Sequence, residues 1–367
     1  MIFRLLLCLV ALFPLLLMQI CADASPYLAT VIRLPDVVSL TPSLSLPVPL
    51  GYAIVSYDLG GMSTGSCFFS QVPLYSEHDV YVAPTSQNGS FLVLANLSSG
   101  SEMFRYSAIN PEQWKSIYMF KDSIPIDALA PPLMVGMDGT VWMWFESATE
   151  KSDVLKIFSP DLGHELGVYV LPPNHAYSAM ALIGSKAVIF EGSSLVTQSL
   201  PQYDIRVVQE NGHIENMNSV VGSWPPRYIS AVDNLVTGMN PNGDLREFQV
   251  DDRGKISVTR TLKLPSQMQV QAYTALDEKT GICVLQTWKE NNPDVSSYQI
   301  ALFSLTDGTI TQTAPLDFSG QGIFTWHDNI FVVDVSGTIH AYTRKLQAIG
   351  ACPPLAGGLS NYAVSQP

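Results

Sequence analysis

The chain has 367 residues, which allows either one large body built of repeats or two to three domains of average size. Hydrophobic residues make up 47% and charged residues 14%, against about 25% charged in ordinary soluble domains, and this excludes a wholly disordered chain. Phosphate groups would repel the net charge of −13, so we expect no nucleic acid and no anionic membrane surface as a partner. The 25 Gly, 25 Pro, 15 Tyr and 15 Phe favour short aromatic strands joined by turns over long helices.

The first residues have the layout of a secretory signal peptide. Arg4 precedes an apolar stretch over residues 5–20, and residues 22–24 (Ala-Asp-Ala) form an A-x-A cleavage site. We expect cleavage after Ala24, so that residues 1–24 are removed and the protein is secreted with no later membrane segment. The alternative is an uncleaved signal anchor that tethers the protein to a membrane, because the stretch approaches the roughly 17 residues that span a bilayer.

The cysteines and two glycosylation motifs fit an oxidising compartment. Cys67, Cys283 and Cys352 remain after cleavage, and an odd number leaves one cysteine unpaired or bonded to another chain. We expect a disulfide between Cys67 and Cys352, which would close the fold, and a buried free thiol at Cys283, which lies in an apolar run. The tripeptides that begin at Asn88 and Asn96 match the sequon for N-glycosylation.

Proline content divides the mature chain. Residues 25–50 are rich in proline, which removes backbone hydrogen-bond donors, so we expect an extended N-terminal segment there. We expect the folded domain over residues 51–355 and a C-terminal tail over residues 356–367.

A unit of four short strands recurs along the folded part. It is clearest over residues 228–262, where four segments with alternating or continuous apolar residues are separated by turns at 233–234, 240–243 and 251–254. The same order of strands and turns returns in four further segments, two of them closely and two more loosely: residues 133–171, 272–314, 177–218 and 78–120. The chain therefore contains five complete units.

Partial units lie at both ends. Residues 322–342 match the first three strands of a unit, and residues 52–57 with 67–72 match its last two strands. Seven units result if residues 27–34 contribute inner strands, whereas six result if the terminal pieces share one unit.

A four-stranded unit repeated every forty to fifty residues or so resembles the blade of a β-propeller. The resemblance stops at the blade, because the chain carries no Gly-His…Trp-Asp signature, no regular paired glycines and no repeated Asp-box. It implies an all-β, seven-bladed β-propeller of four-stranded antiparallel blades, with six blades as the alternative. A β-sandwich or two stacked all-β domains would also give this spacing of turns.

No catalytic motif stands out, so we leave enzymatic activity uncertain and the cofactor unknown. Residues 61–65 match G-x-S-x-G, but a strand and not a helix follows them, and the six histidines lack the spacing of a helical zinc motif. We expect Trp142 and Trp144 to lie in the core, because both faces of their strand are apolar. Carboxylates from different blades, or a metal in the central funnel, would make the protein a carbohydrate-active enzyme; this is the alternative function.

One face of a propeller collects the links between successive blades and the loops between the second and third strands of each blade. We call this the loop-bearing face, and here it would comprise residues 146–151, 173–177, 224–228 and 288–290. Its aromatic and polar side chains are candidates for ligand contacts, since such residues dominate binding surfaces: His175, Trp224, Arg227, Tyr228 and Trp288. We therefore expect a monomeric extracellular recognition module for a protein or glycan.

Overall fold

A computed structural model of the chain describes residues 27–33, 51–60, 69–75, 80–87, 89–97, 100–111, 114–121, 132–146, 152–173, 175–193, 202–221, 226–251, 253–265, 268–289, 292–326, 328–352 and 359–365. All described strands belong to seven four-stranded antiparallel sheets. No helix in these residues has both the length and the apolar character needed to cross a membrane.

The strands of the first half, in chain order, are β1 (Tyr27–Arg33), β2 (Gly51–Asp58), β3 (Phe69–Tyr75), β4 (Tyr81–Pro84), β5 (Ser90–Leu97), β6 (Gly100–Ser107), β7 (Lys115–Phe120), β8 (Leu133–Val135), β9 (Val141–Glu146), β10 (Asp153–Phe158), β11 (Glu165–Val170), β12 (His175–Ile183), β13 (Lys186–Ser193) and β14 (Gln202–Gln209). The second half adds β15 (Ile214–Val221), β16 (Tyr228–Val232), β17 (Leu235–Met239), β18 (Asp244–Val250), β19 (Ile256–Lys263), β20 (Met268–Ala275), β21 (Thr280–Lys289), β22 (Asn292–Ser304), β23 (Ile310–Leu316), β24 (Gly320–Trp326), β25 (Asn329–Asp334), β26 (Ile339–Thr343), β27 (Ala348–Cys352) and β28 (Leu359–Ser365).

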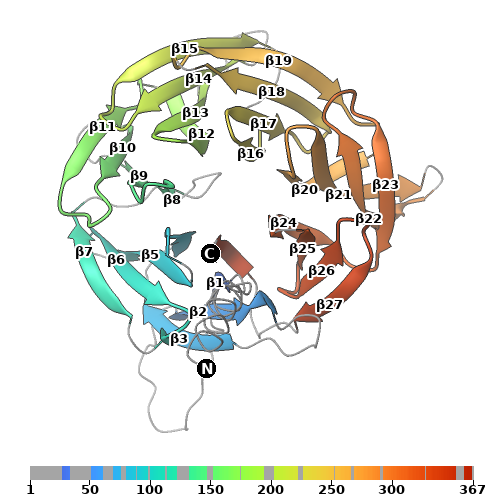
Figure 1. Ribbon diagram of the computed structural model, residues 1–367, viewed down its shortest axis with the longest axis horizontal. Helices are drawn as coiled ribbons and strands as arrows, with labels where there is room; N and C mark the ends of the chain where they lie inside the picture. The colour runs from blue at the N-terminus through green and yellow to red at the C-terminus, as the bar shows by residue number, and fades with distance from the viewer. Residues whose placement is uncertain are drawn as a thin grey trace, which may run out of the picture.

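The seven sheets stand around a common axis as the blades of a propeller (Figure 1). In six of them the chain runs in order from the innermost strand to the outermost, for example β8, β9, β10 and β11. The five complete units expected from the sequence coincide with the blades that begin at β4, β8, β12, β16 and β20. The prediction of a seven-bladed β-propeller is confirmed, and the six-bladed alternative is wrong.

The remaining sheet closes the ring and corrects the expected domain boundaries. Its strand order is β28-β1-β2-β3, so the C-terminal strand β28 pairs antiparallel with β1 and supplies the innermost strand of the first blade. The propeller is therefore not confined to residues 51–355. The expected extended segment contributes β1 and the expected tail contributes β28, because a blade needs four paired strands and the N-terminal part provides only three.

Alternation along each strand packs the blades against one another. Trp142 and Trp144 on β9 join one core cluster with residues of the next blade, whereas Val141, Met143 and Phe145 join another with the preceding blade. Both tryptophans are 0% exposed, which confirms that they are core residues. Side chains at successive positions point to opposite faces of a strand, so a strand between two blades is apolar on both sides.

The turns use aspartate and glycine as the sequence predicts. Oδ1 of Asp251 accepts hydrogen bonds from the backbone N–H groups of Arg253 and Lys255, and Oδ1 of Asp307 accepts one from Thr309. Gly139, between β8 and β9, has a φ of 86°, which residues with a side chain rarely adopt. These aspartates therefore satisfy backbone donors of their own turns.

The structure shows how far the described cysteines and one of the two sequons are buried. Cys283 is a buried free cysteine, as predicted, and Cys352 at the end of β27 is buried and engaged in a disulfide. Cys67 and Asn88 lie outside the described residues. Asn96 is only 2% exposed and its Oδ1 accepts a hydrogen bond from Ser101, so this amide is not accessible for a glycan and the predicted glycosylation of Asn96 is wrong.

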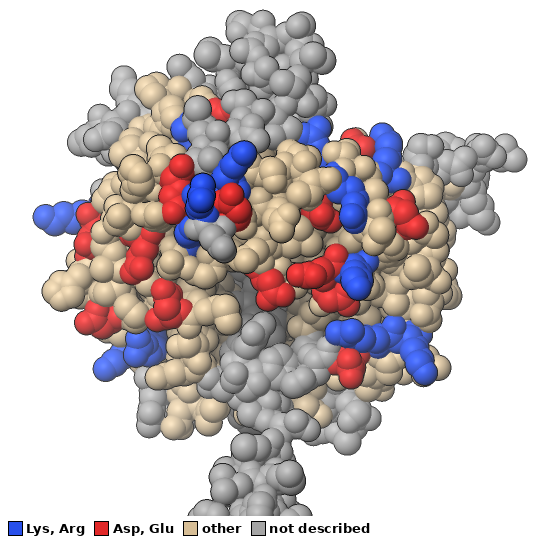
Figure 2. All heavy atoms as spheres, turned by 45° about the horizontal axis from the view of Figure 1, so that its top comes forward, with Lys and Arg blue, Asp and Glu red and all other residues tan. Residues whose placement is uncertain are grey.

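Acidic and basic side chains are interspersed on the surface drawn in Figure 2. The negative net charge of the chain is thus not gathered into one continuous patch among the described residues of this view. Recognition on such a surface depends on individual side chains more than on a single long-range field.

Candidate functional site

Three side chains with metal-ligating groups meet on the blade formed by β12 to β15. His175 begins β12, Glu191 lies near the end of β13, and Asp204 lies near the start of β14. Because neighbouring strands are antiparallel, these positions share one end of the sheet, and Glu191 is paired with Asp204 in the register. This end belongs to the loop-bearing face, where β11 is linked to β12 and β13 to β14.

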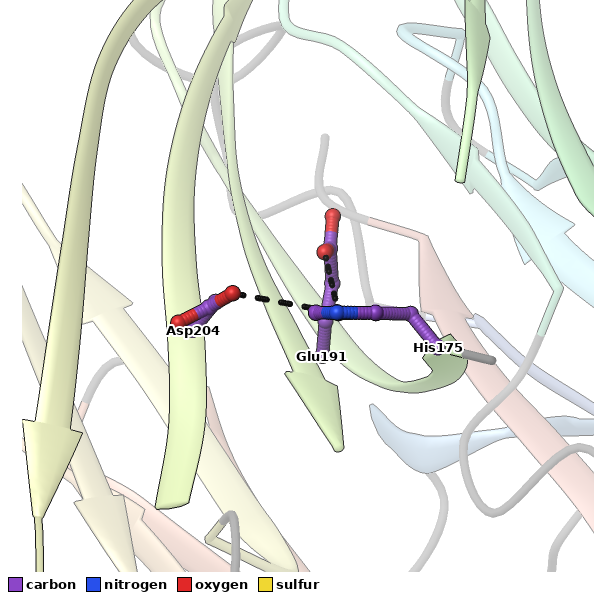
Figure 3. A group of neighbouring side chains, drawn as sticks. All are labelled: His175, Glu191 and Asp204. Atoms are coloured by element: carbon purple, nitrogen blue, oxygen red, sulfur yellow. Dashed lines mark ion pairs between the residues drawn. The ribbon is translucent and has the colours of Figure 1, made fainter. Parts of the chain in front are cut away.

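The imidazole of His175 points toward both carboxylates, and its Nδ1 atom forms an ion-pair contact with each (Figure 3). Its Nδ1 atom is 3.3 Å from Oε2 of Glu191 and 3.8 Å from Oδ2 of Asp204. This Nδ1 is buried and makes no hydrogen bond with any described residue, although the His175 side chain as a whole is 20% exposed. One ligand atom from each of the three residues lies within 4.8 Å of the others, so the three groups converge on one small volume.

Two further polar side chains fix the carboxylate of Glu191. Nε of Arg206, on β14, donates a hydrogen bond to Oε2 at 2.7 Å, and Nη2 of the same guanidinium is 3.6 Å from Oδ2 of Asp204. The phenol of Tyr169, on β11 of the preceding blade, donates a hydrogen bond to Oε1. Each oxygen of Glu191 therefore has a donor, and the carboxylate is held in one orientation.

Burial dominates the electrostatics of this cluster. Glu191 is 0% exposed, and burial raises the pKa of its carboxyl although hydrogen bonds from Tyr169 and Arg206 oppose the shift. Burial, followed by the charge of Glu191, raises the pKa of the Tyr169 phenol, which therefore remains a donor at neutral pH. Burial would lower the pKa of Arg206, but the hydrogen bond and charge of Glu191 outweigh it and raise that pKa. Two carboxyl groups and one imidazole thus face a single guanidinium, an arrangement that attracts a cation.

This carboxylate pair does not fit the expected alternative of glycoside hydrolysis. A glycosidase needs two carboxyl groups that reach the substrate, one as acid and the other as base or nucleophile. Glu191 is fully buried and both of its oxygens accept hydrogen bonds, so it cannot approach a glycosidic bond.

Four of the five sequence-predicted ligand residues are described, and they lie at one face of the propeller but on three different blades. His175 belongs to the cluster, whereas Trp288 is the second-to-last residue of β21 and has 41% of its surface exposed. Arg227 is exposed before β16, and its guanidinium carbon is 5.8 Å from the ring centroid of Tyr228, which is half-buried and donates to the backbone oxygen of Val270. None of the described contacts joins these residues into one pocket. Trp224 lies outside the described residues.

Sequence reasoning found His175 and missed its partners. Glu191, Asp204, Arg206 and Tyr169 come from three strands of two blades, and only the register between those strands brings them together. A signal was nonetheless present: Glu191 follows an apolar run over residues 187–190, and Arg206 interrupts another. A charged residue inside a strand that is buried on both faces needs a partner, and this requirement identifies such positions.

Comparisons with known proteins agree with the architecture. The propeller domain of the Trilobed protease from Pyrococcus furiosus, described as having an open velcro topology, superposes with a TM-score of 0.53 at 11% identity over 89% of this chain and 92% of that one. The Neurospora crassa Pan2 WD40 domain gives 0.52 at 11% identity over 77% and 81% of the two chains, and Saccharomyces cerevisiae Sqt1 gives 0.51 at 12% over 85% and 84%.

No protein-family model matches the chain, and no curated protein matches its sequence significantly. At this level of identity the solved structures show the fold alone. The seven four-stranded blades and these similarities together make the chain a seven-bladed β-propeller.

Proposed function

We propose that this propeller is a recognition module that binds a partner protein through its loop-bearing face. The observation that carries the proposal is the exposed indole of Trp288 at the end of β21. Tryptophan is enriched among the few residues that dominate the energy of protein interfaces, and an indole 41% exposed to water gains from being covered.

The hairpin that carries Trp288 is built to present it. β21 and β22 stay paired beyond Trp288, whose register partner is Ser296, whereas the inner strand β20 pairs no further than Thr287. The hydroxyls of Thr287 and Ser297 are 2.7 Å apart and join the two strands just before the indole. A paired backbone loses little conformational freedom on binding, so more of the contact energy appears as affinity.

An extracellular partner fits the rest of the chain. The predicted signal peptide over residues 1–24, the sequon at Asn88 and a predicted Cys67–Cys352 disulfide all belong to the secretory pathway. The engagement of Cys352 in a disulfide supports this proposal. N-terminal sequencing of the purified protein should begin at Ser25, and a start at Met1 would instead favour the membrane-anchored alternative.

Site-directed crosslinking tests the binding proposal. A photo-crosslinkable residue is placed at position 288 or, as a matched control, at position 137, and each chain is exposed to the extracellular proteins of its source cells. Met137 is 91% exposed in the turn between β8 and β9, which opens on the opposite face. We expect a protein that crosslinks from position 288 and not from position 137.

The affinity of that protein is then measured for the wild type, Trp288→Ala and Met137→Ala. Loss of a dominant interface residue costs about 2 kcal/mol or more, so Trp288→Ala should weaken binding about 30-fold while Met137→Ala leaves it unchanged. Equal affinity of all three chains would contradict the proposal. Loss of binding after the partner is deglycosylated would show that the ligand is a glycan.

A further inference from the structure

We propose that His175, Glu191 and Asp204 bind a divalent transition-metal cation, with Zn²⁺ as the preferred ion. An imidazole nitrogen with two carboxylate oxygens is a donor set that suits zinc better than calcium or magnesium, which prefer sites made wholly of oxygen. The proposal rests on the geometry of the cluster and is independent of the partner proposed above.

The unsatisfied nitrogen of His175 is the first observation. Its Nδ1 atom is buried without a hydrogen bond among the described residues, and the nearest polar atoms are two carboxylate oxygens. Two carboxylate oxygens this close to a ring nitrogen favour a positive charge at that point, and a bound metal ion would supply one. His340 provides a contrast within the same chain, because its Nε2 makes an ordinary 3.0 Å hydrogen bond to Asp334.

The spacing of the ligand atoms is the second observation. Zinc bonds of 2.0–2.2 Å in a tetrahedral arrangement place neighbouring ligand atoms about 3.3–3.5 Å apart. The distance from Nδ1 of His175 to Glu191 is 3.3 Å, and that to Asp204 is 3.8 Å. Both distances from Nδ1 of His175 are therefore within a few tenths of an ångström of the spacing around a tetrahedral zinc ion.

The groups around Glu191 form the outer shell that a metal site requires. Metal-binding carboxylates are commonly held by further hydrogen bonds, and here Tyr169 and Arg206 hold the two oxygens of Glu191. Arg206 offsets one of the two negative charges and leaves one for the cation to neutralise. The side chains of His175 and Asp204 are 20% and 19% exposed, so an ion can enter from solvent.

A bound ion would tie three strands together at the loop-bearing face. His175 is the first residue of β12, and Asp204 and Glu191 lie beside the link between β13 and β14. The metal would thus fix the point where the chain enters this blade, where the imidazole Nδ1 atom makes no hydrogen bond with a described residue.

Zinc titration of the full mature chain tests the proposal. After removal of metals with a chelator, calorimetry with zinc chloride should show one tight site, and cobalt(II) should give the absorption bands of a specific, low-symmetry site. His175→Ala should weaken zinc binding by at least about 100-fold and abolish those bands, whereas Tyr169→Phe, which alters only the outer shell, should weaken it about 10-fold. His340→Ala is the matched control, since it removes a histidine paired with an acid on another blade, and it should leave binding unchanged.

Folding is monitored independently through the thermal midpoint. Zinc should raise the midpoint of the wild type and of His340→Ala but not that of His175→Ala, because only a folded site gains stability from its ligand. The proposal is overturned if the wild type binds zinc no more tightly than His175→Ala. It is equally overturned if His340→Ala loses as much affinity as His175→Ala, or if calcium binds more tightly than zinc.

Discussion

Tyr169 on one blade donates a hydrogen bond from its phenol to the buried carboxylate of Glu191 on the next blade. The two residues are 4% and 0% exposed, and they lie beside an apolar cluster that includes Trp144 and Ile189. A charged hydrogen bond thus joins two sheets that otherwise meet here through side-chain packing, and it makes the orientation of Glu191 depend on the neighbouring blade.

Removing this phenol should destabilise the fold. Tyr169→Phe leaves one oxygen of a buried carboxylate without its donor, and an unsatisfied buried group costs about 1–3 kcal/mol, with charged groups at the upper end. Urea unfolding of the two proteins measures the difference. Tyr273→Phe is the matched control, because the Tyr273 phenol makes a neutral bond of 2.7 Å to Thr237 across another pair of blades. Its cost should be about 1 kcal/mol, and a smaller effect of Tyr169→Phe than of Tyr273→Phe would contradict this account.

Deletion of β28 should open the ring. This strand pairs with β1 from Tyr27↔Ser365 to Ile32↔Leu359, and without it the first blade would present an unpaired inner edge. We expect a chain that lacks residues 359–367 to lose about 3 kcal/mol or more, and therefore to melt at least about 4 °C lower in calorimetry. Deletion of residues 366–367 alone, which follow β28, should leave the midpoint within about 1 °C. Equal midpoints of the two truncated chains would show that β28 does not close the ring.

The blades could be predicted from the sequence because their signal is local. Strands such as β17 and β18 lie between two tight turns, and each turn is marked by aspartate, asparagine or glycine within a few residues. The apolar residues on both faces of β9 also identified it as a strand between two neighbouring blades.

What could not be predicted depends on pairing between distant segments. The sequence of β28 does not indicate which strand it pairs with, since its partner β1 lies more than three hundred residues earlier in the chain. The cluster around Glu191 likewise needs the register of β13 against β14 and the position of Tyr169 on another blade. The predicted glycosylation of Asn96 failed for the same reason. A sequon does not show whether its asparagine side chain is buried once the strands pair.

The thiol of Cys283 should be unreactive in the native protein. It is 0% exposed, and burial raises the pKa of this thiol far above its ordinary value, whereas only the thiolate reacts with alkylating reagents. We expect no labelling of the Cys283 peptide by iodoacetamide at pH 8 in buffer, and complete labelling in urea, as measured by mass spectrometry. Rapid labelling in the native state would contradict the burial of Cys283. Because the unfolded thiol loses its proton near pH 8.5 and the folded one does not, the contribution of this group to stability should fall as the pH rises above about 8.5.

Asp334 should make the protein sensitive to acid. Burial by itself would raise the pKa of this carboxyl, but hydrogen bonds from His340, Ser336 and Thr338 outweigh burial and lower it. A folded-state pKa below the unfolded value of about 3.9 stabilises the protein fully at neutral pH, and this stabilisation is lost as the pH falls through the lowered value. Asp334→Asn should therefore reduce the free energy of unfolding at pH 7 by about 1–3 kcal/mol and should flatten its decline between about pH 5 and pH 2.

Urea midpoints at several pH values measure both effects of Asp334→Asn. The control is Asp328→Asn, whose side chain is 89% exposed and contacts Arg344 at 3.2 Å, so its loss should cost less than about 1 kcal/mol and leave the pH profile unchanged. If Asp334→Asn keeps the steep decline of the wild type in acid, another carboxylate is responsible. The network that joins the turn after β25 to His340 on β26 would then be structural without being acid-sensitive, because its hydrogen bonds would form equally well with a protonated group.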